Sequence, residues 1–321
     1  MHKGLLIGID GGGTHSTAVA AWPDGRIAAV AYGDGLNFYN VGVDVVKQRI
    51  NAMVQDLCEQ ADAPLHCVCV GMSALDGPGD EATHTLFTSD VIAREQLDLQ
   101  SDAYIALAGF ARGEPGMIVI CGTGSMLFLC DKEGNQHVSG GWGYLLGDAG
   151  SGYTLAREGL LAAIDASEGL APATPLEALA CQYFSTPTLR QTIDRVYAPD
   201  FTPDRLAGFA RHVLAEAKNG DGAARAILER NMERLARQAA HLLNKEPTAR
   251  RVGLYGGIFA HSDEARAAFT KTLKALAPQA EVSFLSAPPE IGAVIHLMQK
   301  EGSLSEEILH NLTYSYEEMK R

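Results

Sequence analysis

Two short apolar runs near the N-terminus flank a stretch of glycines. Residues 5–9 are apolar and lead into Asp10–Thr14; small and β-branched residues follow up to Ala21, then a Pro-Asp-Gly turn and a second apolar run over 27–32. Short apolar or β-branched runs bounded by glycine, proline and aspartate are typical of strands joined by tight turns. We therefore predict three strands and two turns in this region.

The first turn has the composition of a phosphate-binding loop but not the usual context. Rossmann and Walker loops open into a helix, whose N-terminal amides receive the phosphate, whereas a strand is predicted here. A Lys-Ser/Thr pair is missing, and Ser16 stands near the place of the third glycine of the dinucleotide fingerprint. We expect a hairpin whose backbone amides approach a phosphate, with Asp10 placed to organise a metal ion through water. An ordinary hairpin with a flexible tip is the alternative.

The same pattern recurs about 110 residues later. Apolar residues 117–121 lead into Gly122-Thr123-Gly124-Ser125, a second apolar run covers 126–130, and residues 131–134 form the next turn. A duplicated hairpin predicts two similar domains that face each other across a cleft, each offering a glycine turn to one polyphosphate.

The rest of the chain alternates between helical and strand patterns. Apolar residues from Val43 to Leu57 recur at helical spacing. Further helices are predicted in the eighties and early nineties, after the glycine-rich segment 140–152, over 223–243 and from Pro289 onward, and strands over 67–70 and 281–286. A strand, a Gly256-Gly257 turn and a helix are predicted around residue 256. This alternation indicates an α/β protein.

Composition narrows the choice of partners. A chain of 321 residues exceeds the size of most single cores, which favours two domains. It contains no apolar run long enough to span a membrane, and its N-terminal apolar run is too short for a signal sequence, so we expect a cytoplasmic protein. The net charge of −13, without a basic cluster, argues against nucleic acid and anionic membranes as partners. The six cysteines form no C-x-x-C pair and are expected to be reduced, buried thiols.

Five segments taken together resemble a known family. They are Asp10–Thr14, Ser101–Ala103, Gly122–Ser125, Gly140–Gly152 and Leu254–Phe259, in that order. The chain resembles the N-acetylglucosamine kinase family, in the BadF/BadG/BcrA/BcrD-type ATPase branch of the actin, sugar kinase and heat-shock chaperone superfamily. The segment GGWGYLLGDAGSGY is the most specific part of the resemblance.

The resemblance implies two ribonuclease-H-like domains, over 1–112 and 113–321, closing over a sugar and MgATP. The second domain would carry a helical insertion, and a helix over about 289–300 would pack back on the first. Residues implied at the ATP phosphates are Gly12, Gly13, Thr14 and Thr123; Gly256 and Gly257 would line the adenosine pocket, and Asp10 would position Mg2+. Residues implied at the sugar are Asn37, in preference to Asn40, and Ser125, Trp142, Gly143 and Asp148. Asp102 matches the catalytic base.

Each of these side chains also has a plainer interpretation. Ser101-Asp102 is a good helix N-terminus, which is compatible with catalysis. Trp142 could belong to the core, Asp148 could be a turn residue, and Asn37 could make a local turn bond. The phosphoryl transfer nevertheless requires a general base, because the sugar hydroxyl must lose its proton as it attacks the γ-phosphorus.

One departure affects the choice of sugar. The family commonly has Asp-Glu-Gly-Ser where this chain has Asp148-Ala149-Gly150-Ser151. Losing a carboxylate near the sugar favours a neutral acetamide over an ammonium group at C2. We therefore predict a kinase acting on the 6-hydroxyl of N-acetylglucosamine. Glucosamine is the alternative substrate, and acceptance of N-acetylmannosamine or a muramyl sugar stays open.

Two other function classes share the superfamily. An ATP-driven activator of dehydratases or reductases would need cysteines that hold an iron-sulfur cluster between subunits, and no cysteine lies in a glycine-flanked bridging loop. A chaperone-like protein would have no use for the 142–148 loop or for Asp102. The family habit suggests a homodimer.

Overall fold

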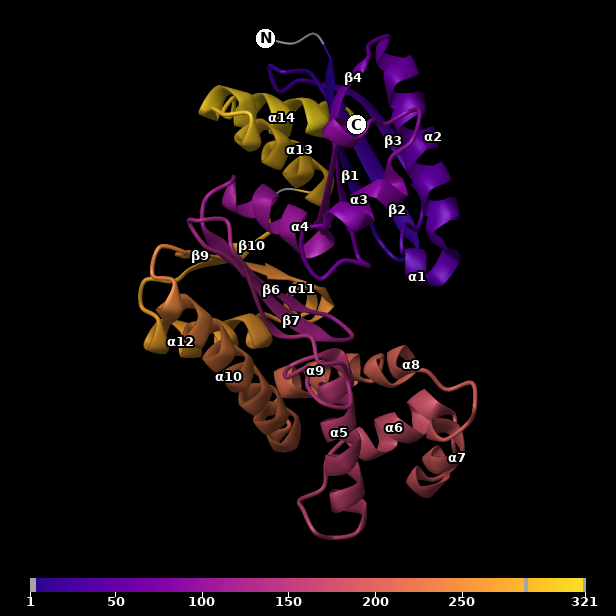
Figure 1. Ribbon diagram of the computed structural model, residues 1–321. Coiled ribbons are helices and arrows are strands. Elements are labelled where there is room, and N and C mark those ends of the chain that lie inside the picture. Colours follow the sequence, from indigo (N-terminus) through magenta and orange to yellow (C-terminus); the bar gives the residue numbers. More distant parts are fainter. Residues whose placement is uncertain (1–3, 286–287, 320–321) are drawn as a thin grey trace. The chain divides into compact units, whose positions relative to one another are not determined.

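The chain divides into two compact units in the computed structural model, which describes residues 4–285 and 288–319. Unit 1 comprises the residues up to Gly116, residues 132–136 and those from Leu285 onward; unit 2 comprises residues 117–131 and 137–284. Each unit has its own five-stranded sheet with helices around it, so the α/β class is confirmed (Figure 1).

The sheet of unit 1 has the order β3-β2-β1-β4-β5. Its first three strands are antiparallel and consecutive, as predicted, whereas β4 and β5 run parallel to β1. The strands are β1 (Leu5–Gly11), β2 (His15–Ala21), β3 (Ile27–Asp34), β4 (Leu65–Met72) and β5 (Leu97–Ser101).

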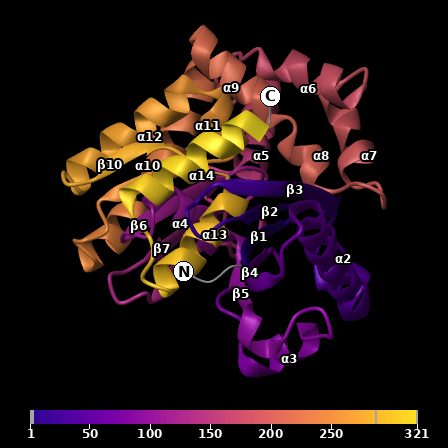
Figure 2. The same ribbon diagram turned by 90° about the horizontal axis from the view of Figure 1, so that it is seen from above.

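Alternating side chains of this sheet pack against two different sets of helices. Ile7 belongs to one buried cluster with Ile50 of α2, and its neighbour Leu6 belongs to another with Val294 of α13. Both views show α2 on the side of the sheet opposite α13 and α14 (Figures 1 and 2). The helices of unit 1 are α1 (Phe38–Val41), α2 (Val43–Ala61), α3 (Glu81–Phe87), the 3-10 turn η1 (Arg94–Gln96), α4 (Asp102–Ala111), α13 (Pro289–Lys300) and α14 (Glu306–Met319).

Two helices of unit 1 differ from the sequence prediction. Helix α3 ends at Phe87, before the early nineties, because Thr88 is extended and the Ser89 hydroxyl then accepts hydrogen bonds from the amides of Val91 and Ile92. Helix α14 is absent from the predicted elements, although Leu312 and Tyr316 bury an apolar side.

The start of α13 lies directly against β1. A Cβ atom at Gly8 would lie 2.2 Å from the carbonyl oxygen of Glu290, so only glycine permits this approach. The contact brings the first turn of a helix near residue 290 to the strand that ends in Asp10.

The sheet of unit 2 has the order β10-β9-β6-β7-β8. The strands are β6 (Gly116–Cys121), β7 (Ser125–Cys130), β8 (Gln136–Gly140), β9 (Arg251–Tyr255) and β10 (Glu281–Phe284). The second strand-turn-strand unit is therefore confirmed. The predicted strand over 281–286 ends at Phe284, and residue 286 lies outside the described residues.

The helices of unit 2 share one large core with its sheet. Leu155 of α5, Leu235 of α10 and Phe269 of α12 are fully buried in a single cluster with Met117 and Leu127 of the strands. Helices α6, α8 and α9 pack beside α5 (Figure 1). The helices are α5 (Gly152–Ser167), α6 (Leu176–Phe184), the 3-10 turn η2 (Leu189–Gln191), α7 (Thr192–Val196), α8 (Pro203–Ala207), α9 (Ala210–Asn219), α10 (Gly222–Lys245), α11 (Gly257–His261) and α12 (Asp263–Leu276).

Two expectations from composition concern the whole chain. All six cysteines are free thiols, as predicted, but only Cys69 and Cys121 are buried; the other four are partly exposed, so the expected burial is wrong for them. Within residues 4–285 and 288–319, no helix combines the length and the apolar character that crossing a membrane would require.

Candidate active site

The first glycine turn offers exposed backbone at the end of a buried strand. Gly13 and Thr14 are exposed, and nothing lies within 4 Å of the Cβ position at Gly13. The amide of Leu36 donates to the carbonyl oxygen of Gly12 at 2.9 Å, which ties the turn to the segment after β3. The predicted phosphate residues Gly12, Gly13 and Thr14 therefore form one anchored and accessible turn.

Asp10 lies at the end of β1 in an unfavourable environment for its charge. Burial, followed by repulsion from Glu290 and Asp102, raises the pKa of Asp10 to about 7. The Tyr316 hydroxyl of α14 donates a hydrogen bond to the buried Glu290 carboxylate. In the described part of the chain, no lysine or arginine makes an ion pair with Asp10, Asp102 or Glu290.

This donor set fits a divalent cation. Carboxylate oxygens are hard ligands that Mg2+ accepts directly or through water, and a cation would relieve the repulsion that raises the pKa of Asp10. Asp10 and Glu290 are the residues that would hold Mg2+ in unit 1. Sequence reasoning missed Glu290, although the acidic side chain stands one helical turn before Val294 on the apolar side of its helix, which is an available signal.

Asp102 is the first residue of α4, so both of its predicted roles have a structural basis. The Ser101 hydroxyl accepts the Tyr104 amide at 3.1 Å and caps the helix. The Asp102 carboxylate accepts the amide of Ala103 at 2.6 Å. Burial raises the pKa of Asp102, and this backbone hydrogen bond opposes the shift. A carboxylate with a raised pKa is a better proton acceptor than an ordinary one.

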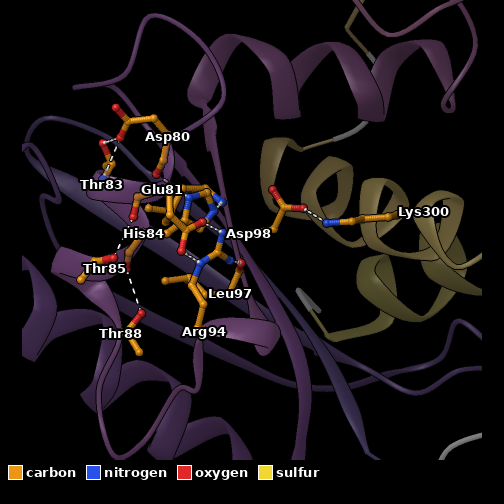
Figure 3. A network of polar contacts seen from close by, with 11 residues as sticks. Asp80, Glu81, Thr83, His84, Thr85, Thr88, Arg94, Leu97, Asp98 and Lys300 are labelled. Carbon is orange, nitrogen blue, oxygen red and sulfur yellow. Dashed lines mark hydrogen bonds and ion pairs between the residues drawn. The ribbon is translucent and has the colours of Figure 1, made fainter.

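Strand β5, which leads to Asp102, is held along its outer edge. His84 of α3 accepts the amide of Leu99 at its Nε2 atom, at 3.2 Å, and its Nδ1 atom donates to the carbonyl oxygen of Asp80 at 2.9 Å. Asp98 accepts a hydrogen bond from Lys300 of α13 at 2.8 Å (Figure 3). It accepts another from Gln100 at 2.8 Å. These contacts link the edge strand to α3 and to α13.

The Asn37 side chain makes two contacts: its oxygen caps a helix, and its amide nitrogen contacts Ser73. Its Oδ1 atom accepts the Tyr39 amide at 3.1 Å and caps α1, as in the plain interpretation. Its Nδ2 group donates to the Ser73 hydroxyl at 3.5 Å, just after β4. Ser73 is a neighbour that sequence reasoning missed, since 36 residues separate the two. Asn40 is exposed and does not share these contacts.

The second glycine turn lines a cavity of about 740 Å³ within unit 2. Gly122 and Thr123 form one wall, Gly152 at the start of α5 lies beside them, and Gly257 begins α11 on another side. The Gly152 amide donates to the carbonyl oxygen of Gly122 at 2.7 Å, so α5 begins against the turn. Thr123 and Gly257, which were predicted at opposite ends of a nucleotide, therefore share one cavity.

Gly256 serves this cavity indirectly. Its φ of 102° lies in the region that favours glycine, and a Cβ atom there would lie 2.4 Å from the carbonyl oxygen of Cys121. Gly256 thus lets the β9–α11 turn approach β6, whereas Gly257 lines the cavity. The remaining wall comes from α8 and α9, with Asp204, Arg211 and Lys218, and from the end of α11, with His261; the sequence did not single out any of these residues.

Asp148 carries the clearest sign of a missing partner in unit 2. It is 6% exposed, has a φ of 61°, and receives backbone hydrogen bonds from Ser125 and Gly143. Burial nevertheless raises the pKa of Asp148. Its Oδ1 atom is buried and has no hydrogen-bond partner among the described residues. A buried acceptor without a donor costs about 1–3 kcal/mol, which a ligand hydroxyl could recover.

Ser125 and Gly143 contact this carboxylate, and Trp142 precedes Gly143 in the same loop. The Ser125 hydroxyl donates to the carbonyl oxygen of Ala149 at 2.8 Å, so its side chain is already used within the loop. Ser125 and Gly143 therefore act on Asp148 through their amides. Trp142 is 73% exposed, which contradicts the alternative that it belongs to the core, and its Cβ atom lies 3.0 Å from the Cβ position at Gly147.

Comparison with known proteins identifies the family. A model of the BadF/BadG/BcrA/BcrD ATPase family matches residues 7–312. The chain belongs to this family. It is 28% identical over 241 residues to the N-acetyl-D-glucosamine kinase of Dictyostelium discoideum, covering 71% of this chain and 76% of that protein. It is 30% identical over 231 residues to the glucosamine kinase GspK of Vibrio cholerae, covering 70% and 75% of the two chains.

A solved structure extends the likeness to the fold. A candidate N-acetylglucosamine kinase from Chromobacterium violaceum superimposes with a TM-score of 0.68 at 25% identity, over 92% of this chain and 99% of that one. The predicted family is therefore confirmed by both sequence and structure.

Proposed function

We propose that this family member is an ATP-dependent kinase that phosphorylates the 6-hydroxyl of N-acetylglucosamine. The family match and the kinases among its relatives support the reaction class. The observation that supports a small hydroxylated substrate most directly is the buried, unpartnered oxygen of Asp148. A sugar hydroxyl is a donor of the right kind for that oxygen.

Unit 1 would supply the base and the metal-holding carboxylates. Asp102 would accept the proton of the 6-hydroxyl, since burial raises its pKa while an amide keeps its carboxylate oriented. Gly12, Gly13 and Thr14 would give amides to the phosphates, and Asn37 would bind a sugar hydroxyl with its remaining amide hydrogen. Mg2+, when bound near Asp10, would neutralise charge on the phosphates.

Unit 2 would hold the nucleoside and one side of the sugar. The cavity beside Thr123 and Gly257 has the volume expected of a small-molecule site. Asp148, oriented by the amides of Ser125 and Gly143, would accept a sugar hydroxyl, and the exposed Trp142 ring would cover an apolar face of the sugar.

Ala149 bears on the choice between the acetylated and the free amino sugar. It is 4% exposed and follows Asp148 directly, so the family's glutamate has no counterpart at this position. An ammonium group at C2 would lack that nearby negative charge, which favours the neutral acetamide. Glucosamine is the second candidate, because a relative that is 30% identical is a glucosamine kinase.

The test is ADP release with MgATP and N-acetylglucosamine, glucosamine or glucose, for the wild type and Asp102→Asn. We expect the highest kcat/KM with N-acetylglucosamine and a fall in kcat of about 100-fold or more in the variant, as loss of a general base causes. Faster turnover of glucosamine would reverse the substrate assignment. ATP hydrolysis that ignores every sugar and survives the substitution would overturn the kinase proposal.

A further inference from the structure

A second cavity of about 470 Å³ lies among helices α6, α7 and α8 of unit 2. Its walls are Tyr183 and Phe184 at the end of α6, Arg195 in α7, and the segment from Ala198 to Arg205 that leads into α8. Figures 1 and 2 both show these helices gathered at one end of the unit. None of these residues belongs to the candidate active site.

The positive groups of this cavity exceed its negative ones. Arg205 is an exposed arginine with an acidic partner: its Nη1 atom lies 3.3 Å from the Asp200 carboxylate, and its Cζ atom lies 5.9 Å from the centre of the Phe201 ring. Arg195 is exposed, and no ion pair of Arg195 occurs in the described part of the chain. In a chain with a net charge of −13, an arginine pair with one acidic partner marks a local site for an anion.

Aromatic rings form the apolar side of the same cavity. The Phe184 ring centre lies 4.9 Å from that of Tyr183 and 6.2 Å from that of Phe201. Phe184 is 8% exposed and belongs to the core, so the partly buried Tyr183 and Phe201 supply the apolar surface against which a sugar or another compact ring can pack. Rings beside an unpaired guanidinium group suit a ligand that joins a ring to an anionic group.

One helix and one side chain separate this cavity from the 740 Å³ cavity. Helix α8 lines the second cavity with Arg205 and the first with Asp204. The Tyr183 hydroxyl donates to the carbonyl oxygen of Arg205 at 2.7 Å and lies 2.3 Å from the Cβ position at Gly208, which lines the first cavity. The Arg211 guanidinium, also in the first cavity, lies 5.3 Å from the Tyr183 ring centre.

We propose that this second cavity is a regulatory site for a phosphorylated sugar, with the phosphate on Arg195 and the ring against Phe201. Movement of Tyr183 or α8 on binding would change the wall of the first cavity and therefore the affinity for the nucleotide. The regulatory part rests on the proposed function, since it takes the first cavity as the nucleotide site.

Binding is tested by calorimetric titration with N-acetylglucosamine 6-phosphate, and separately with inorganic phosphate. Both titrations use the full chain saturated with N-acetylglucosamine and a non-hydrolysable ATP analogue, which occupy the candidate active site. We expect Arg195→Ala to weaken binding by about tenfold or more, as loss of a charge-assisted contact to phosphate does. Arg190→Ala, an exposed arginine of the neighbouring turn η2, is the matched control and should bind like the wild type.

A second variant and a second measurement complete the test. Ala198→Glu places a carboxylate in the cavity wall and should abolish binding, and circular dichroism checks that each variant is folded. Tighter binding of the sugar phosphate than of phosphate would show that the rings contribute. The site would be overturned if no binding is detected at ligand concentrations up to about 10 mM, because a weaker Kd means negligible affinity. It would also be overturned if the wild type and Arg195→Ala bind with equal affinity.

Coupling is measured as the Kd of ADP with and without the sugar phosphate. We expect a change of about fivefold, at the low end of typical coupling energies, and no change in Arg195→Ala. An unchanged ADP affinity despite binding would overturn the regulatory part. Failure of the kinase proposal would show differently, as loss of sugar phosphorylation while Arg195-dependent binding persists.

Discussion

Gly292→Ala should destabilise unit 1 by bringing a side chain against the helix that carries Asp102. A Cβ atom at Gly292 of α13 would lie 1.8 Å from the carbonyl oxygen of Ile105 and 2.7 Å from the amide nitrogen of Gly109, both in α4. Normal contacts between carbon and oxygen are about 3.3–3.6 Å. Because the obstacle is backbone, the two helices must separate by roughly 1.5 Å.

The magnitude follows from two opposing effects. Overpacking a well-packed contact costs about 1–3 kcal/mol, and a backbone obstacle places this case at the upper end. Alanine recovers up to about 1 kcal/mol of helix propensity relative to glycine. The free energy of unfolding should therefore fall by about 2 kcal/mol, which lowers Tm by about 4–8 °C in a unit of this size.

Activity should fall as well, because Ile105 lies three residues after Asp102 in the same helix. A displacement of a catalytic group by about 1 Å can cost about 100-fold in rate. Gly222→Ala is the matched control: it begins α10, has no atom within 4 Å of its Cβ position, and has no positive φ. It should leave kcat unchanged and Tm equal or slightly raised.

The measurements are scanning calorimetry and ADP release with N-acetylglucosamine for both variants and the wild type. A Gly292→Ala protein with a Tm within about 1 °C of the wild type would refute the packing argument, because that corresponds to less than about 0.5 kcal/mol. A lowered Tm with an unchanged kcat would refute the claim that the α13 contact positions Asp102.

Three further predictions concern charge and cavity shape. Since burial and the neighbouring carboxylates raise the pKa of Asp10 from 3.8 to about 7, its protonated form contributes stability that is present below about pH 4 and lost as the pH rises through about 7. In EDTA, Asp10→Asn should thus resist urea better than the wild type at pH 8, and the difference should vanish toward pH 4. Burial raises the pKa of Asp98, but hydrogen bonds from His296 and Lys300 outweigh burial and hold this pKa below its usual value. The Asp98 carboxylate therefore contributes stability that is lost on acidification. Asp98→Asn should lower the free energy of unfolding by about 2 kcal/mol at pH 7, measured by urea unfolding. Ala215→Trp should place an indole ring in part of the 740 Å³ cavity and raise KM for ATP by about tenfold or more, with KM for the sugar unchanged, in steady-state assays.

The local sequence pattern is sufficient to predict those elements that depend only on residues close together in the chain. The glycine turns at residues 12–14 and 122–124, and the helix that starts at Asp102, follow from strand periodicity, glycine and a serine cap. Contacts between distant segments are different. Glu290 reaches Asp10 only because Gly8 lets α13 approach β1, and no local pattern specifies that approach.

The sugar-side loop shows the same limit. Asp148, Ser125 and Gly143 are singled out by the resemblance to the family, because composition alone would leave Asp148 as a turn residue. The resemblance does not show that Ser125 and Gly143 hold Asp148 through their amides, since those contacts depend on the loop conformation and on Gly124, whose Cβ position lies 2.9 Å from the Asp148 carboxylate. In the same way, Lys218 reaches the 740 Å³ cavity only through the packing of α9 beside α5.

The three aspartates of the candidate active site share one physical property, and it argues for bound ligands. Burial raises the pKa of Asp10, of Asp102 and of Asp148, and one Asp148 oxygen has no partner in the described residues. Each of these groups lowers the stability of the protein alone, so a fold optimised for stability would replace them. A cation near Asp10 and sugar hydroxyls at Asp102 and Asp148 would each relieve part of that cost, and any ligand that binds only the folded chain raises Tm. The polar groups that weaken the free protein are therefore those that the substrate and the metal ion are expected to satisfy.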